Sequence, residues 1–75
     1  MKKHLIINGM ISNHCKQRVE LILNNIQGVN SAEVILDKKT AVIDFEGKFE
    51  KLIFESALEK GGYHLQEIRN PEEIQ

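Results

Sequence analysis

Two stretches with helical hydrophobic spacing lie among four short stretches in which apolar and polar residues alternate, and this order constrains the fold most. In the first helical stretch, Cys15, Val19, Ile22 and Ile26 recur at intervals of four, three and four residues. The predicted elements are a strand over His4–Asn8, a helix over Asn13–Asn25, strands over Asn30–Leu36 and Thr40–Phe45, a helix over Phe49–Lys60 and a strand over Tyr63–Ile68.

Short connections and right-handed crossovers favour one compact solution for this order, with the first strand central, between the third and the fourth. We therefore expect an α+β protein of the ferredoxin-like β-α-β-β-α-β type, a four-stranded antiparallel sheet with two helices on one face. The loop Gly9–Cys15 and Tyr63 then share one end of the molecule. We expect one domain over residues 1–69 and a short C-terminal tail over 70–75, because Pro71 cannot continue a strand.

The inward positions of these patterns define a predicted core. Its members are Leu5, Ile7, Val19, Ile22, Ile26, Val34, Leu36, Ile43, Phe45, Phe54, Leu58 and Leu65. The second helix is expected to bury Phe49, Ile53 and Ala57 as well. On the outer face of the sheet, alternation places Ile6, Ile35 and Val42 on neighbouring strands. A contiguous exposed apolar row there would indicate a contact surface.

The charge balance narrows the choice of partners. Ten Lys and Arg residues against 11 Asp and Glu residues give a formal net charge of −1, which offers no basis for expecting nucleic acid. No apolar run is long enough for a membrane span or the core of a signal peptide, so we expect a cytoplasmic protein without membrane insertion. The single cysteine cannot form an internal disulfide.

Cys15 falls in the first turn of the first predicted helix, where unpaired backbone N–H groups and the helix dipole favour an anion. A thiol in such a position tends to have a lowered pKa. Thiolates are the ligands that soft ions such as Cu(I) prefer. Spacing alone also allows Cys15 to be an inert residue on the buried stripe of the helix. Ser12 or Asn13 can cap the same helix, and Met10 can fill the core beneath the loop.

The segment Gly9-Met10-Ile11-Ser12-Asn13-His14-Cys15 resembles the metal loop of heavy-metal-associated domains, whose pattern is G-M-x-C-x-x-C. That family includes soluble copper chaperones, the N-terminal domains of copper-transporting P-type ATPases and a periplasmic mercury-binding protein. The similarity continues to Gly62-Tyr63 and covers about residues 4–68. It implies the fold predicted above, Cys15 as a metal ligand, and Ser12 in the position of the missing first cysteine.

Within this resemblance, His14 is a further candidate ligand, while Met10 and Tyr63 are expected to support the loop and shield the site from water. The implied cargo is Cu(I) or another soft heavy-metal ion. One chain offers one good soft ligand, so a second molecule is expected to complete the site. That molecule would be a domain of a P-type metal ATPase or a second copy of this chain.

The alternative is a degenerate heavy-metal-associated domain that binds no metal and serves as a protein interaction module. Ser12 favours this alternative, whereas the presence of Met10, His14, Cys15 and Tyr63 favours the metal carrier. We do not expect an enzyme, because the chain has no nucleophile and base with an orienting group, no phosphate-binding loop and no paired carboxylates.

Overall fold

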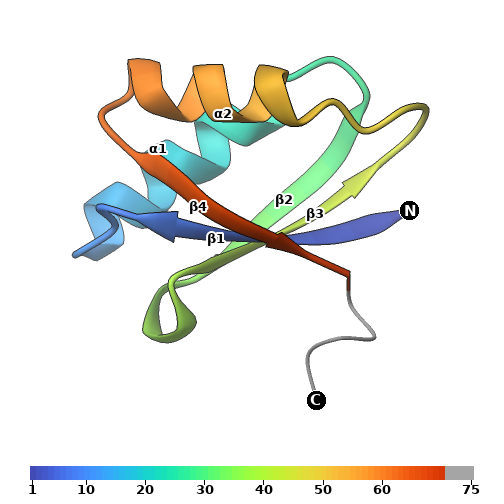
Figure 1. Ribbon diagram of the computed structural model, residues 1–75. Helices are drawn as coiled ribbons and strands as arrows, with labels where there is room; N and C mark the ends of the chain where they lie inside the picture. Colours follow the sequence, from blue (N-terminus) through green and yellow to red (C-terminus); the bar gives the residue numbers. More distant parts are fainter. Residues whose placement is uncertain (71–75) are drawn as a thin grey trace.

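The computed structural model describes residues 1–70 and contains the predicted helices and strands in the predicted order (Figure 1). The elements are β1 (Lys2–Asn8), α1 (Asn13–Asn24), β2 (Val29–Ile35), the 3₁₀ turn η1 (Leu36–Lys38), β3 (Thr40–Phe45), α2 (Lys51–Lys60) and β4 (His64–Arg69). Of the predicted tail, all but Asn70 lies outside the described residues. Over residues 1–70, no helix has both the length and the apolar character needed to cross a membrane.

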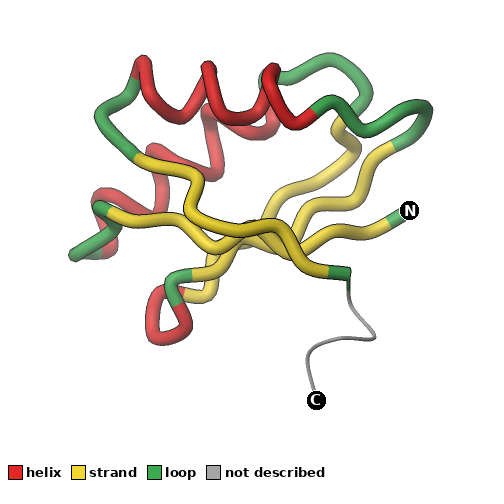
Figure 2. Tube along the Cα trace, in the orientation of Figure 1, coloured by secondary structure: helices red, strands yellow, loops and turns green. Residues whose placement is uncertain are grey.

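The strands form one antiparallel sheet in the order β2-β3-β1-β4. Strand β1 therefore lies between β3 and β4, as the topology argument predicts. Figures 1 and 2 show both helices on the same side of the sheet. The predicted ferredoxin-like β-α-β-β-α-β fold is confirmed.

Helix α1 ends one residue earlier than predicted, and Gly28 lies in the turn that follows it. The helix ends at Asn24 and is capped by Asn25 in a right-handed backbone conformation. Gly28 has a φ of 93° and leads the chain into β2. A Cβ atom at Gly28 would lie 3.0 Å from the carbonyl oxygen of Glu46. Both the positive φ and the close backbone favour glycine at this turn.

Helix α2 begins at Lys51, whereas the hydrophobic pattern predicted a start at Phe49. Glu50 has an extended backbone, with φ −120° and ψ 103°. The Phe49 ring stacks on Phe54 with 4.9 Å between centroids and lies 5.4 Å from the Phe45 centroid. Aromatic packing of this kind stabilises the segment without helical backbone, so the apolar pattern begins before the helix does.

Most of the predicted core is buried between the helices and the sheet. The buried apolar residues are Leu5, Ile7, Met10, Val19, Leu23, Val34, Ala41, Ile43, Phe45, Phe54, Leu58, Tyr63 and Leu65. Three predicted members, Ile22, Ile26 and Leu36, are only partly buried. The predicted burial of Ile53 is wrong, since this side chain is 48% exposed. In α1, Val19 and Leu23 are both fully buried, so the helix face that carries them is the innermost one.

The outer face of the sheet carries Ile6, Ile35 and Val42, but they do not form the expected exposed row. All three are partly buried. Thr40 is the direct cross-strand partner of both Ile6 and Ile35, while Val42 lies opposite His4 and Glu33. The apolar side chains are therefore diagonal neighbours separated by polar positions.

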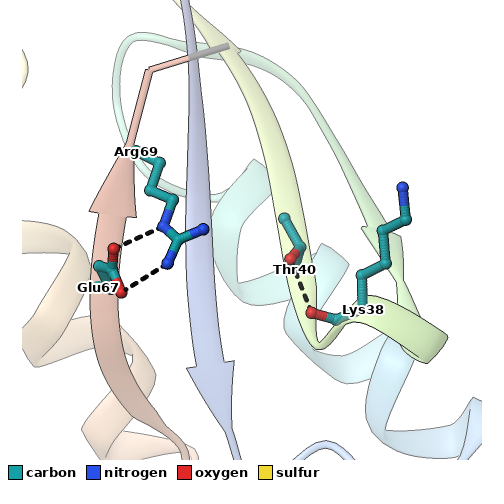
Figure 3. A network of polar contacts seen from close by, with 4 residues as sticks. All are labelled: Lys38, Thr40, Glu67 and Arg69. Carbon is teal, nitrogen blue, oxygen red and sulfur yellow. Dashed lines mark hydrogen bonds and ion pairs between the residues drawn. The ribbon is translucent and has the colours of Figure 1, made fainter. Parts of the chain in front are cut away.

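Polar contacts border this outer face (Figure 3). The Thr40 hydroxyl donates a hydrogen bond to the Lys38 carbonyl oxygen at 2.8 Å, and Thr40 is only 4% exposed. On β4, the Arg69 guanidinium donates hydrogen bonds to Glu67, which lies opposite Ile6. These hydrogen bonds lower the pKa of the Glu67 carboxyl. The face is thus amphipathic and does not form a continuous apolar patch.

Candidate functional site

The loop between β1 and α1 and the residue before β4 meet at one end of the molecule, as the topology predicts. Asn8 at the end of β1 pairs with His64 at the start of β4. Gly9, with a φ of 101°, lies against Tyr63, because a Cβ atom at Gly9 would lie 3.4 Å from Cδ1 of the tyrosine ring. This arrangement places Tyr63 against the loop that leads to Cys15, although the two segments are far apart in sequence.

Ser12 is the N-terminal cap of α1. Its backbone is extended, with φ −152° and ψ 168°, and its side-chain oxygen accepts a hydrogen bond from the Cys15 backbone N–H at 3.4 Å. The same hydroxyl donates to the Cys15 Sγ atom at 3.7 Å. Of the two candidate caps, Ser12 and Asn13, the structure therefore uses Ser12. The same side chain also contacts the Cys15 sulfur.

Cys15 is a free, partly exposed thiol in the first turn of α1. A backbone hydrogen bond from Ile11, then side-chain hydrogen bonds from Ser12 and Tyr63, lower the pKa of the Cys15 thiol from 9.0 to about 7. Partial burial opposes this shift. The lowered pKa agrees with the expectation for a thiol in the first turn of a helix. The principal cause is a set of discrete hydrogen bonds, the first of which comes from the loop before the helix.

Tyr63 covers one side of the site from within the core. It is 5% exposed, and burial is the main reason that the pKa of its phenol is raised above 10.0. The hydrogen bond to Cys15 and the charge of the thiolate raise that pKa further, whereas the Arg18 guanidinium lowers it. The Arg18 Cζ atom lies 5.9 Å from the centroid of the Tyr63 ring. A phenol held in this way shields the sulfur on the protein side.

Met10 and His14 occupy opposite environments. Met10 is 3% exposed and belongs to the core cluster, so it supports the loop from below. His14 is exposed beside Cys15 on α1. Successive helical residues point about 100° apart, since a turn holds about 3.6 residues. The side chains of His14 and Cys15 therefore do not point toward one common metal position.

Two contributors to the site were not identified from the sequence. Ile11 supplies the backbone hydrogen bond to Cys15, while its side chain is 87% exposed. No sequence signal marks a backbone contact of this kind. Arg18 could have been identified, because it lies three residues after Cys15 and such pairs share a helix face.

The donor set of one chain is small. Within residues 1–70 there is no group of three or more His, Cys, Asp or Glu side chains that could hold a metal ion. One thiolate with adjacent hydroxyl groups suits one coordination position of a soft ion and leaves the others open.

The sequence is similar to heavy-metal-associated domains. Residues 4–64 match the family described as the heavy-metal-associated domain. The copper chaperone CopZ of Staphylococcus aureus (strain MRSA252) is 40% identical over 62 residues, which span 81% of this chain and 91% of that protein.

Solved structures show the same fold. A CopZ metallochaperone superposes with a TM-score of 0.81 and 34% sequence identity, covering 88% of this chain and 100% of the other. The N-terminal domain of a potential copper-translocating P-type ATPase from Bacillus subtilis, in the Cu(I)-loaded state, superposes with a TM-score of 0.76. That domain is 29% identical, and the match covers 92% of this chain and 90% of the domain.

Proposed function

Because this chain belongs to the heavy-metal-associated domain family, we propose that it is a cytoplasmic, copper-chaperone-like carrier that binds a soft metal ion through Cys15. The observation that carries this proposal is a partly exposed thiol whose pKa is about 7, at the end of the molecule where the loop and Tyr63 meet. Such a thiol is substantially ionised near neutral pH, and thiolates prefer soft ions. The similarity to copper chaperones makes Cu(I) the first candidate cargo.

A second molecule completes the site in this proposal. Ser12, at the position of the first cysteine in the family pattern, offers a hard and neutral oxygen, which is a poor ligand for Cu(I). That oxygen is also engaged as the cap of α1. Two Cys15 thiolates that meet across a two-fold axis would supply the near-linear S–Cu–S arrangement that one chain lacks.

The coordination position that one chain leaves unfilled on the ion also suits transfer to a protein with two cysteines. Cys15 would then act as a transient additional ligand while the ion moves to the partner. The similarity to an N-terminal domain of a P-type ATPase makes such a domain the proposed partner. Metal is cargo in this scheme, and the protein binds and transfers it without catalysing a reaction.

Anaerobic titration of the reduced protein with Cu(I), against a competing chelator and at several protein concentrations, tests the proposal. We expect about one ion for every two chains, with affinity that increases with protein concentration, because the ion is shared between two copies. Sedimentation should show dimers only when Cu(I) is present. Cys15→Ala should abolish binding, whereas His14→Ala should leave it nearly unchanged.

Binding of one ion per chain, without a change in mass, would contradict the shared site. An absence of Cu(I) binding at every concentration would favour the second candidate, an interaction module without metal. The observation that favours this second candidate is Ser12, which caps α1 at the position of the first cysteine in the family pattern.

A further inference from the structure

Arg18 contacts the buried tyrosine that reaches the thiol. Its Cζ atom lies 5.9 Å from the centroid of the Tyr63 ring, within the range of a cation–π contact. Tyr63 is 5% exposed, whereas Arg18 is an exposed residue of α1. The guanidinium therefore covers the aromatic ring at the boundary with solvent.

The edges of the same ring are bordered by backbone. A Cβ atom at Gly9 would lie 3.4 Å from Cδ1 of Tyr63, and one at Gly61 would lie 3.3 Å from Cδ2 and Cε2. The ring therefore lies close to both glycines, where a larger residue would crowd it. The Arg18 side chain lies over a face of the same ring.

We propose that Arg18 is a positioning residue of the Cys15 site, which holds the Tyr63 ring against the loop that leads to Cys15. Arg18 lies three residues after Cys15, so one helix face carries both the thiol and the residue that holds its hydrogen-bond donor. The consequence for metal exchange rests on the proposed function, but the contact between Arg18 and Tyr63 exists in the metal-free chain.

Removing an exposed cation–π contact corresponds to roughly a two- to fivefold gain in the population of the released ring. A released ring would expose its own face and one side of the Cys15 sulfur to water. Lysine keeps the charge but cannot stack as a planar guanidinium does, so Arg18→Lys should restore the contact only partly.

The chain contains one tyrosine and no tryptophan, so its intrinsic fluorescence reports on Tyr63 alone. Acrylamide quenching of this emission should be measured in metal-free, reduced wild-type protein and in Arg18→Ala, Arg18→Gln and Arg18→Lys. Lys16→Ala is the matched control, because it removes the same charge from the same helix. The nuclear Overhauser effect between the Tyr63 ring and the Cys15 β protons provides the second readout.

We expect Arg18→Ala and Arg18→Gln to increase quenching roughly two- to fivefold and to weaken the Tyr63–Cys15 Overhauser effect. Arg18→Lys should fall between them and the wild type, and Lys16→Ala should match the wild type. Unchanged quenching in both Arg18 variants that remove the charge, or an equal effect of Lys16→Ala, would overturn the inference. These measurements contain no metal, so a failure of Cu(I) binding would not alter them, and their failure would leave the proposed carrier function intact.

Discussion

The hydroxyl group of Ser12 accepts a hydrogen bond from the backbone N–H of Cys15 at 3.4 Å and lies 3.7 Å from the sulfur of the same residue. One side chain therefore both starts helix α1 and lowers the pKa of the thiol. The stability of the helix and the ionisation of the candidate ligand are linked through this residue.

Replacing Ser12 with alanine should affect both properties. We expect Ser12→Ala to reduce the free energy of unfolding by about 1 kcal/mol, the typical contribution of an N-cap. The pKa of Cys15 should rise from about 7 toward 9.0, because one of its hydrogen-bond donors is lost. Denaturant unfolding and alkylation rates as a function of pH measure the two effects. Ser31→Ala, at an exposed position of β2, is the control, and an unchanged alkylation midpoint in Ser12→Ala would contradict the assigned role.

A second cysteine at the Ser12 position should change how metal binds. We expect Ser12→Cys to bind about one Cu(I) per chain, with an affinity independent of protein concentration, because both thiolates then belong to one loop. Chelator competition at two protein concentrations distinguishes this behaviour from the shared site proposed for the natural sequence. If the variant and the natural sequence gave the same stoichiometry and concentration dependence, Ser12 would not be the residue that determines the binding mode.

The lowered pKa of Cys15 predicts that stability depends on pH. Because the pKa is about 7 in the folded chain and 9.0 ordinarily, the unfolded chain binds more protons between these values. The stabilising contribution is complete above pH 9 and is lost as the pH falls through 7. The melting temperature of reduced, metal-free wild type should therefore rise relative to Cys15→Ser between about pH 6 and about pH 9. Tyr63 does not interfere in this window, because its pKa is raised above 10.0. A difference in melting temperature that stays constant with pH would be inconsistent with the shift.

Two neighbouring residues of α1 should differ in their effect on stability. Leu23 is fully buried, whereas Ile22 is only partly buried. We expect Leu23→Ala to cost about 2–5 kcal/mol of unfolding free energy, as for other large-to-small core changes, and Ile22→Ala to cost clearly less. Chemical denaturation of both variants measures the difference. Equal losses would mean that α1 is rotated differently on the sheet.

The sequence predicted the fold because each helix and strand shows its own spacing of apolar residues, near 3.6 in helices and 2 in strands. The alternation in Thr40–Phe45 identified that strand with its observed bounds. Helix boundaries were predicted less well, since the apolar pattern records burial and not backbone conformation. Phe49 illustrates the difference, because it packs against Phe54 from outside the helix.

For the candidate site, the sequence determined that Cys15 would stand in the first turn of a helix beside a serine that could cap it, because capping and helix position are local properties. Tertiary structure decided what surrounds the sulfur. The hydrogen bond from Ile11 depends on the path of the loop, and the contact with Tyr63 depends on the pairing of β1 with β4. The position of Arg18 over the tyrosine ring likewise depends on how α1 sits against the residue before β4. Sequence periodicity specifies which face of an element is buried, whereas contacts between distant segments arise only when strand register and helix rotation are fixed together.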